Sequence, residues 1–280
     1  IMIIKCWGSR GSIPVSGGQY VVYGGDTTCL EITAGSGETI IIDAGTGIRR
    51  LGNVLLEQQK TQYYMLLTHC HWDHIMGIPF FKPLLYTRNR LVIQDRKIAD
   101  FSTKDVFNRV LCPPFFPVRL KDLKADISFD AALNNHFYIG SVEIDSIPTS
   151  HSQGSLGYKF TEDGKTFVFL TDNELGFSHP QGQGIDGYRR FSRHADVLFH
   201  DAEYTQAEYL SRKGWGHSSV PHALDLAVQA GVGQLGLIHL NQDRSDNDVN
   251  AIVQDCKEIL TSKKSALFCY GVSCDFEITL

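Results

Sequence analysis

Three histidines and an aspartate lie within six consecutive residues of this 280-residue chain, and this motif limits the possible folds more than any other feature. The residues are His69, His71, Asp73 and His74, in the pattern H-x-H-x-D-H. The motif directly follows the apolar run Tyr63–Leu67, which is typical of a short buried strand. Functional residues often lie on loops that a rigid sheet positions, so we expect a site at the end of this strand. Three imidazoles and a carboxylate suit a borderline cation such as zinc better than calcium or magnesium.

Six residues are too few to complete two metal sites, so further ligands are expected elsewhere in the chain. Four candidates each follow an apolar run in the same way: His151, Asp172, His200 and His239. A single histidine at the end of a strand is more often a structural residue. Four candidates beside so specific a motif favour the metal-binding interpretation for most of them.

The hydrophobic pattern predicts a mixed α/β domain that spans residues 1–280. Strands are expected at residues 2–7, 29–33, 39–42, 63–67, 141–147, 157–161, 166–170, 196–199 and 234–238, with a hairpin between the second and third. Helices are expected at residues 48–60, 220–230 and 246–260. We find no repeat and no long polar linker, which favours one domain.

One segment differs from the rest in charge. Residues 82–124 hold ten Lys or Arg and four Asp or Glu, a net charge of +6, whereas the whole chain carries −5. The segment is either a solvated helical surface or a lid-like insertion that draws an anionic substrate toward a site. It contains Phe115 and Phe116, which are candidates for stacking on a base or for packing against the core. The acidic remainder argues against nonspecific nucleic-acid binding by the whole surface.

The chain resembles the metallo-β-lactamase superfamily in the H-x-H-x-D-H motif, in the later ligand candidates and in the upstream run Asp43-Ala-Gly-Thr-Gly47. The resemblance implies an α/β fold of the αββα four-layer sandwich type, with the site at one edge of the two sheets. It also implies two divalent metal ions, for which we expect zinc, with manganese and iron as alternatives. Asp43 would order the site loops without binding metal. The implied ligands are His69, His71 and His151 for one ion and Asp73, His74 and His239 for the other, with Asp172 bridging the two.

Two later stretches indicate a branch of the superfamily. The runs around His200 and His217 resemble paired motifs of ribonuclease Z and related phosphodiesterases, although Asp201 stands where that group usually has glutamate. The resemblance implies His200 as general acid and His217 as its partner, with Asp73 orienting the nucleophile. Ser218 and Ser219 precede an expected helix whose first N–H groups can hold phosphate oxygens. A bridging Asp172 and the lack of an export signal make β-lactamase activity unexpected.

We therefore expect a dinuclear metal-dependent phosphodiesterase acting on a small anionic substrate such as a nucleotide or short nucleic acid. Two alternatives stay open: a thioester or lactone hydrolase of the same fold, and a non-catalytic metal-binding regulatory module. No apolar run approaches the ~20 residues of a membrane span, so no membrane association is expected. Seven cysteines without a C-x-x-C pair indicate reduced thiols in a cytoplasmic protein. A homodimer is compatible with these features.

Overall fold

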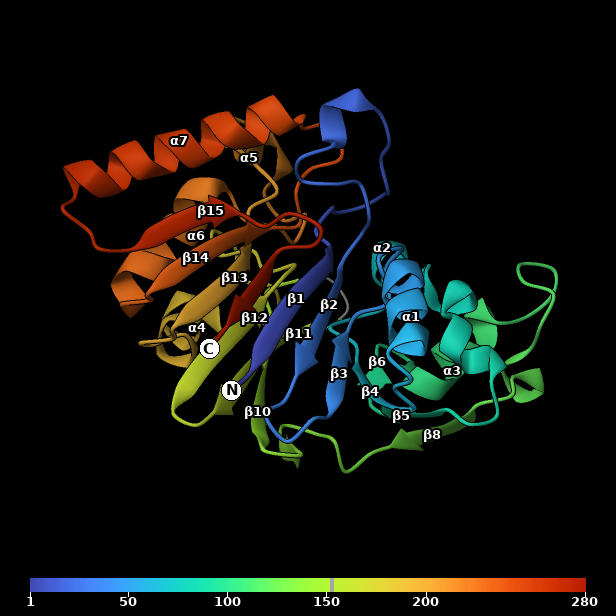
Figure 1. The fold of residues 1–280 in the computed structure, drawn as a ribbon. Coiled ribbons are helices and arrows are strands. Elements are labelled where there is room, and N and C mark those ends of the chain that lie inside the picture. Colours follow the sequence, from blue (N-terminus) through green and yellow to red (C-terminus); the bar gives the residue numbers. More distant parts are fainter. Residues whose placement is uncertain (152–153) are drawn as a thin grey trace.

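Two seven-stranded sheets stack face to face in the computed structural model, which describes residues 1–151 and 154–280 (Figure 1). In spatial order, the first sheet contains β16 (Glu277–Thr279), β1 (Ile3–Gly8), β2 (Cys29–Thr33), β3 (Thr39–Ile42), β4 (Gln62–Leu66), β5 (Arg90–Gln94) and β8 (Asp126–Asp130). The second contains β15 (Phe268–Gly271), β14 (Gln234–Ile238), β13 (Val197–Asp201), β12 (Lys165–Leu170), β11 (Leu156–Glu162), β10 (Val142–Pro148) and β9 (His136–Ile139). A two-stranded ribbon joins β6 (Lys97–Ile98) to β7 (Phe101–Ser102).

Helices cover the outer faces of both sheets, which confirms the four-layer αββα prediction (Figure 1). On the side of the first sheet are α1 (Ile48–Glu57), α2 (Trp72–Ile75) and α3 (Thr103–Val110). On the side of the second sheet are α4 (Gly184–Phe191), α5 (Gln206–Arg212), α6 (Val220–Ala230) and α7 (Asp246–Ser262). Short 3-10 turns are η1 (Gly18–Tyr20), η2 (Ile78–Phe80), η3 (Lys82–Leu85) and η4 (Leu120–Asp122). Among the described residues, none of these helices combines the length and the apolar character needed to cross a bilayer.

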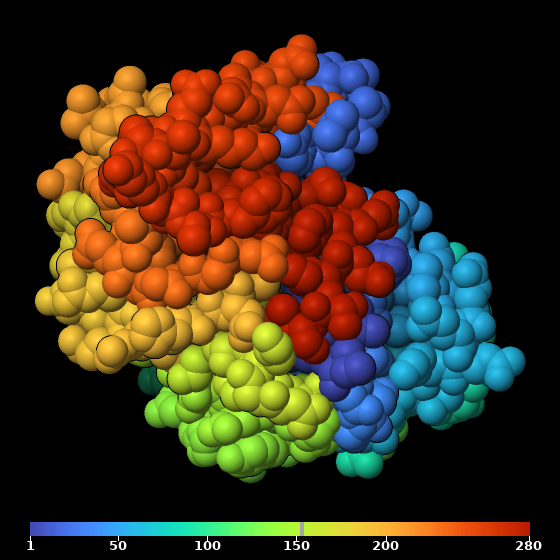
Figure 2. Space-filling model, turned by 60° about the vertical axis from the view of Figure 1, so that its left-hand side comes forward, coloured from blue at the N-terminus to red at the C-terminus, as the bar shows by residue number. Residues whose placement is uncertain are grey.

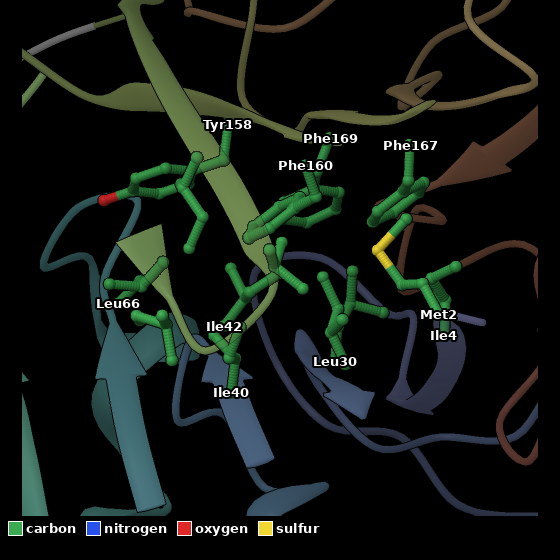
Figure 3. Packing of buried hydrophobic residues seen from close by; sticks show 14 of the residues in the cluster. Met2, Ile4, Leu30, Ile40, Ile42, Leu66, Tyr158, Phe160, Phe167 and Phe169 are labelled. Carbon is green, nitrogen blue, oxygen red and sulfur yellow. The ribbon is translucent and has the colours of Figure 1, made fainter. Parts of the chain in front are cut away.

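The main core lies between the two sheets (Figure 3). Aliphatic side chains such as Ile4, Leu30 and Ile42 from the first sheet meet the rings of Phe160 and Phe167 from the second. Because successive side chains of a strand point to opposite faces, the neighbouring residues pack against the outer helices instead. Central strands are therefore apolar on both faces, and all four residues of β3 are buried.

The direction of the strands brings the site residues together. The first sheet is parallel from β3 to β8, and the second is parallel from β12 to β15. Parallel strands end at the same edge of a sheet, so the residues after β4, β12 and β14 share one edge of the sandwich. These are the positions of the H-x-H-x-D-H motif, Asp172 and His239.

The expected strands and helices are present with bounds that agree within two residues, except that α1 ends at Glu57, three residues early. β2 and β3 form the expected antiparallel hairpin. The basic segment 82–124 is not a lid throughout its length, because its residues 90–94 form β5 inside the first sheet.

The loop before β2 is tied to the start of α7. The backbone N–H groups of Val22 and Tyr23 donate to the carboxylate of Asp246, at 2.8 and 3.1 Å. Figure 2 shows this loop, in blue, against the orange end of α7. The contact holds the N-terminal loop beside the edge of the sandwich that carries the site.

Candidate metal centre

The seven predicted metal ligands meet at this edge in two adjoining groups. In each group the potential ligand atoms all lie within 4.8 Å of one another. All seven side chains are buried except His71, which is half-buried. The first group contains His69, His71, His151 and Asp172, and the second contains Asp73, His74 and His239.

The carboxylate of Asp172 faces both groups. Its Oδ2 lies 3.6 Å from Nε2 of His69 and 3.6 Å from Nε2 of His151. Its Oδ1 lies 3.3 Å from Nε2 of His74 and 3.5 Å from Nε2 of His239. One oxygen is thus directed at each group, which is the arrangement that a bridging ligand requires.

Asp43 and Thr68 orient two of the histidines by binding their Nδ1 atoms, on the side of each ring that faces away from the centre. His74 Nδ1 donates to Asp43 Oδ2 at 2.8 Å. The Thr68 hydroxyl donates to the same carboxylate at 2.8 Å and therefore accepts from His69 Nδ1, 3.1 Å away. Both imidazoles carry a proton on Nδ1, so their Nε2 atoms point into the centre.

Two more histidines are oriented in the same way by groups of the second half of the chain. His151 Nδ1 donates to the carbonyl oxygen of Gly216 at 2.9 Å, and His239 Nδ1 donates to Glu203 Oε2 at 3.0 Å. A carbonyl and a carboxylate can only accept, so Nδ1 again carries a proton and Nε2 is the atom that faces the centre.

The chemistry of the donor set fits metal ions. His69 Nε2 and His74 Nε2 are buried and have no hydrogen-bond partner in the described part of the chain. A buried polar atom without a partner is costly, and a cation would satisfy both. Burial lowers the pKa of His69 well below its usual value, which keeps it in the neutral form that binds metal. For His74, burial lowers the pKa, but Asp73, Asp172 and Asp43 raise it well above its usual value, and this negative charge also attracts a cation.

Two glycines leave room for the ligand rings. A Cβ atom on Gly11 would lie 2.2 Å from the His239 ring, and one on Gly216 would lie 2.0 Å from His151 Nδ1. Gly216 also adopts a φ of +92°, which disfavours other residues. Both positions therefore require glycine if the histidines are to keep their places.

Two hydrogen bonds, from the Ser12 N–H and with His239 Nε2, hold Asp73 at its Oδ2. The backbone N–H of Ser12 donates to it at 2.9 Å, and Nε2 atoms of His239 and His74 lie 3.2 and 3.3 Å away. The carboxylate is therefore fixed at the border of the second group.

His217 lies beside the centre and is paired with Asp201. Its Nδ1 donates to Asp201 Oδ2 at 2.9 Å, and its ring stacks on that of His239 with centroids 4.8 Å apart. Burial lowers the pKa of His217, but the Asp201 carboxylate outweighs this and raises the pKa above its usual value. Asp201 stands where the resemblance led us to expect glutamate, and its shorter side chain still reaches His217.

His200 is not brought to the centre, contrary to the general-acid prediction. It is fully buried, its Nδ1 donates to the carbonyl oxygen of Asp201 at 2.6 Å, and its Nε2 accepts from the Asn173 amide at 3.2 Å. Burial also lowers its pKa. With both nitrogens engaged by protein groups, this ring has no proton directed at a substrate.

The serines and one phenylalanine predicted to contact substrate are used inside the protein. The hydroxyl of Ser218 donates to the carbonyl oxygen of Asn173 at 2.6 Å, and that of Ser219 donates to Gln206 at 3.1 Å. Both serines are fully buried, which argues against direct contact with a substrate. Phe116 packs against Phe80, with ring centroids 6.0 Å apart, and against the core beneath α1.

Phe115 differs from its neighbour. Its side chain is 81% exposed and lines a cavity next to the H-x-H-x-D-H motif. Of the two candidate phenylalanines, the structure places only this one where a ligand can reach it.

Glu174 is a supporting residue that sequence reasoning missed. Its Oε1 accepts from the Tyr209 hydroxyl and the Gly214 N–H, both at 2.7 Å. Its Oε2 accepts from the Gly216 N–H at 2.8 Å and from His179 Nε2 at 3.0 Å. Burial raises the pKa of this carboxyl, but these hydrogen bonds outweigh it and leave the pKa below its usual value. Its position two residues after Asp172 is the only signal in the sequence that could have marked it.

Glu203 was also missed, although it lies three residues after His200, in one of the two runs that sequence analysis compared with ribonuclease Z. Besides the bond to His239, it accepts a short hydrogen bond from Asn241. A metal-binding histidine usually donates its second N–H to a carboxylate or carbonyl, so a search for carboxylates beside the ligand strands could have found it.

Comparisons with known proteins agree with this geometry. Residues 38–240 match the profile of the beta-lactamase superfamily domain. A protein named ribonuclease Z from Haloarcula marismortui is 27% identical over 259 residues, which cover 73% of this chain and 78% of that protein.

Solved structures share the fold at low sequence identity. The metallo-beta-lactamase fold protein YhfI from Bacillus subtilis superposes with a TM-score of 0.68 at 16% identity, covering 99% of this chain and 98% of that one. A diphosphatase from the PhnP family superposes with a TM-score of 0.67 at 15% identity, covering 100% and 98%.

Proposed function

The chain belongs to the beta-lactamase superfamily and is a metal-dependent hydrolase of the nuclease and phosphodiesterase type, and on that basis we propose that it cleaves small phosphodiesters of the nucleotide type. The observation that carries the proposal is the carboxylate of Asp172, which directs one oxygen toward each histidine group. Two-metal sites of this kind are typical of phosphoester hydrolases. The relative named ribonuclease Z supports the same class of substrate.

The proposed ligands are the seven residues of the two groups, with Asp172 shared between them. Nitrogen and carboxylate donors without thiolate suit zinc, and manganese and iron are the alternatives. When bound, such ions polarise a phosphoryl oxygen and make water a stronger nucleophile near neutral pH.

The protein's own groups are proposed to handle orientation and proton transfer. Asp73, held by the Ser12 N–H, orients the attacking water through its carboxylate. His217, whose Nδ1 proton is held by Asp201, donates a proton from Nε2 to the leaving oxygen. The pairing with Asp201 favours the imidazolium form that this step requires. His200 is left out of this role because both of its nitrogens bond within the protein.

Hydrolysis of a substrate panel tests the proposal. Protein reconstituted with zinc or manganese is assayed on bis(p-nitrophenyl) phosphate, a thioester and a lactone, with elemental analysis of the same samples. We expect about two metal ions per chain and turnover of the phosphodiester above the other two. Asp172→Asn should lower both metal content and turnover, because its carboxylate serves both groups.

Preferential turnover of the thioester or lactone would replace the proposal by the carboxyl-ester alternative. Bound metal with no turnover of any substrate would favour a regulatory module. Asp186→Asn is a matched control, because it removes an exposed carboxylate that forms an ion pair with Arg189 on α4. It should change neither the metal content nor the turnover.

A further inference from the structure

A cavity of about 740 Å³ adjoins the candidate metal centre. Small-molecule sites are usually about 300–1,000 Å³, so its volume suits a substrate group rather than a few waters. One wall comes from the H-x-H-x-D-H motif and the opposite wall comes from α3 and the β6–β7 ribbon. None of the predicted metal ligands lines it, and it is open to solvent.

Residues of the same motif line both the centre and the cavity. His69, His71, Asp73 and His74 belong to the two ligand groups. Cys70, Trp72 and Ile75, which alternate with them, line the cavity. The cavity and the centre are therefore neighbours along this motif, and Trp72, which lies between His71 and Asp73, is exposed at the cavity.

The cavity combines an apolar interior with aromatic rings at its rim. Ile98 and Val110 are buried in its wall, whereas Trp72 is 57% exposed and Phe115 is 81% exposed. Exposed rings at the mouth of an apolar pocket offer flat faces on which a planar group can stack.

Two charged side chains line this surface, the carboxylate of Asp100 and the guanidinium of Arg109. Arg109 lines the cavity, and its Cζ lies 4.0 Å from the centre of the Phe101 ring, which also lines it. Arginine stacked on an aromatic ring is a common element of nucleobase sites. The surrounding segment, residues 82–124, has a net charge of +6 and attracts the phosphate to which such a base is attached.

We propose that this cavity binds the nucleobase of a nucleotide phosphodiester while its phosphate lies at the metal centre. The inference rests on the proposed function and narrows its substrate class. An aliphatic chain would also find the interior favourable, but it would gain nothing from Arg109 or from the flat exposed faces of Trp72 and Phe115.

Three p-nitrophenyl diesters with the same leaving group test the proposal: the methyl, the octyl and the thymidine 5′ ester. Stacking on aromatic side chains is expected to raise kcat/KM for the thymidine ester roughly 5- to 100-fold over the methyl ester. Phe115→Ala should lower this ratio about 5-fold or more. Phe268→Ala removes a ring that is 57% exposed on β15 and does not line the cavity, so it should leave the ratio unchanged.

A direct binding measurement accompanies the kinetics. Thymidine 5′-monophosphate should quench the tryptophan fluorescence of the metal-loaded protein, and Trp72→Phe should abolish most of the quenching. A ratio near one, or equal losses in Phe115→Ala and Phe268→Ala, would overturn the nucleobase assignment while turnover of the methyl ester upholds the phosphodiesterase function. A preference for the octyl ester would assign the cavity to an aliphatic chain instead. Quenching that depends on Trp72 without turnover of any diester would uphold the cavity and refute the proposed function.

Discussion

Replacing Glu174 by glutamine tests how strongly the loop that carries Gly216 and His217 depends on one buried carboxylate. Glu174 accepts four hydrogen bonds, two of them from the backbone N–H groups of Gly214 and Gly216. Glutamine keeps one carbonyl oxygen but places an NH₂ group where the other carboxylate oxygen was. Two of the four hydrogen-bond donors would then face this NH₂ group, which cannot accept a hydrogen bond from them.

The magnitude follows from these contacts. A hydrogen bond to a charged group contributes about 1.5–3 kcal/mol, so two lost bonds would cost about 3–6 kcal/mol if the loop stayed in place. Movement of the loop toward solvent relieves part of this, and we expect a loss of about 2–4 kcal/mol in the free energy of unfolding. Because Gly216 also holds His151, the apparent affinity of the first ligand group for metal should fall about 10- to 100-fold.

Chemical denaturation of chelator-treated protein measures the first effect, and metal titration measures the second. Glu258→Gln, an exposed change on α7, is the control. The pKa of Glu174 is depressed in the folded protein, so its contribution is present above the unfolded value and is lost as pH falls through the folded value. The difference between wild type and variant should therefore shrink in acid. Equal stability at neutral pH together with unchanged metal affinity would refute the role assigned to this carboxylate.

Three further substitutions separate the other roles. Gly11→Ala should displace the His239 ring and weaken metal binding about 10- to 100-fold in a titration. An unchanged metal affinity would contradict the requirement for glycine at this position. Burial raises the pKa of Glu31, so its ionised carboxylate destabilises the folded protein at neutral pH, and this penalty disappears below the unfolded pKa of 4.5. Glu31→Gln should therefore raise the melting temperature at pH 7 but not at pH 4. His217→Ala should slow a poor alkoxide leaving group about 10²–10⁴-fold and p-nitrophenolate much less, whereas His200→Ala should lower stability and slow both alike.

Most strands that sequence analysis predicted have few exposed residues. Runs such as residues 40–42 and 235–238 contain no polar side chain, so their pattern is unambiguous. Several strands and helices with exposed faces were missed, and so was the largely buried β5. β8 begins and ends with aspartate, β15 exposes Phe268, and α5 contains only one buried side chain. Their stability comes from neighbours that lie far away in the sequence.

The ligand groups were accessible from sequence because each member follows an apolar strand, and the resemblance then divided them between two ions. The supporting residues were not accessible in this way. Two of the four donors to Glu174 are backbone N–H groups about 40 residues downstream, and no side-chain pattern reveals such donors. The serine prediction failed for a related reason, because Ser218 satisfies the backbone around Asn173 instead of facing solvent.

The two ligand groups span the boundary between the halves of the chain. His69, His71, Asp73 and His74 follow β4, whereas His151, Asp172 and His239 belong to the later sheet. The halves are also interlocked, since β16 from the end of the chain pairs with β1 in the first sheet (Figure 1). Neither half alone contains a complete ligand set, so metal uptake is a natural reporter of fragment complementation. Polypeptides divided in the 131–135 connection should capture metal only after they reassociate.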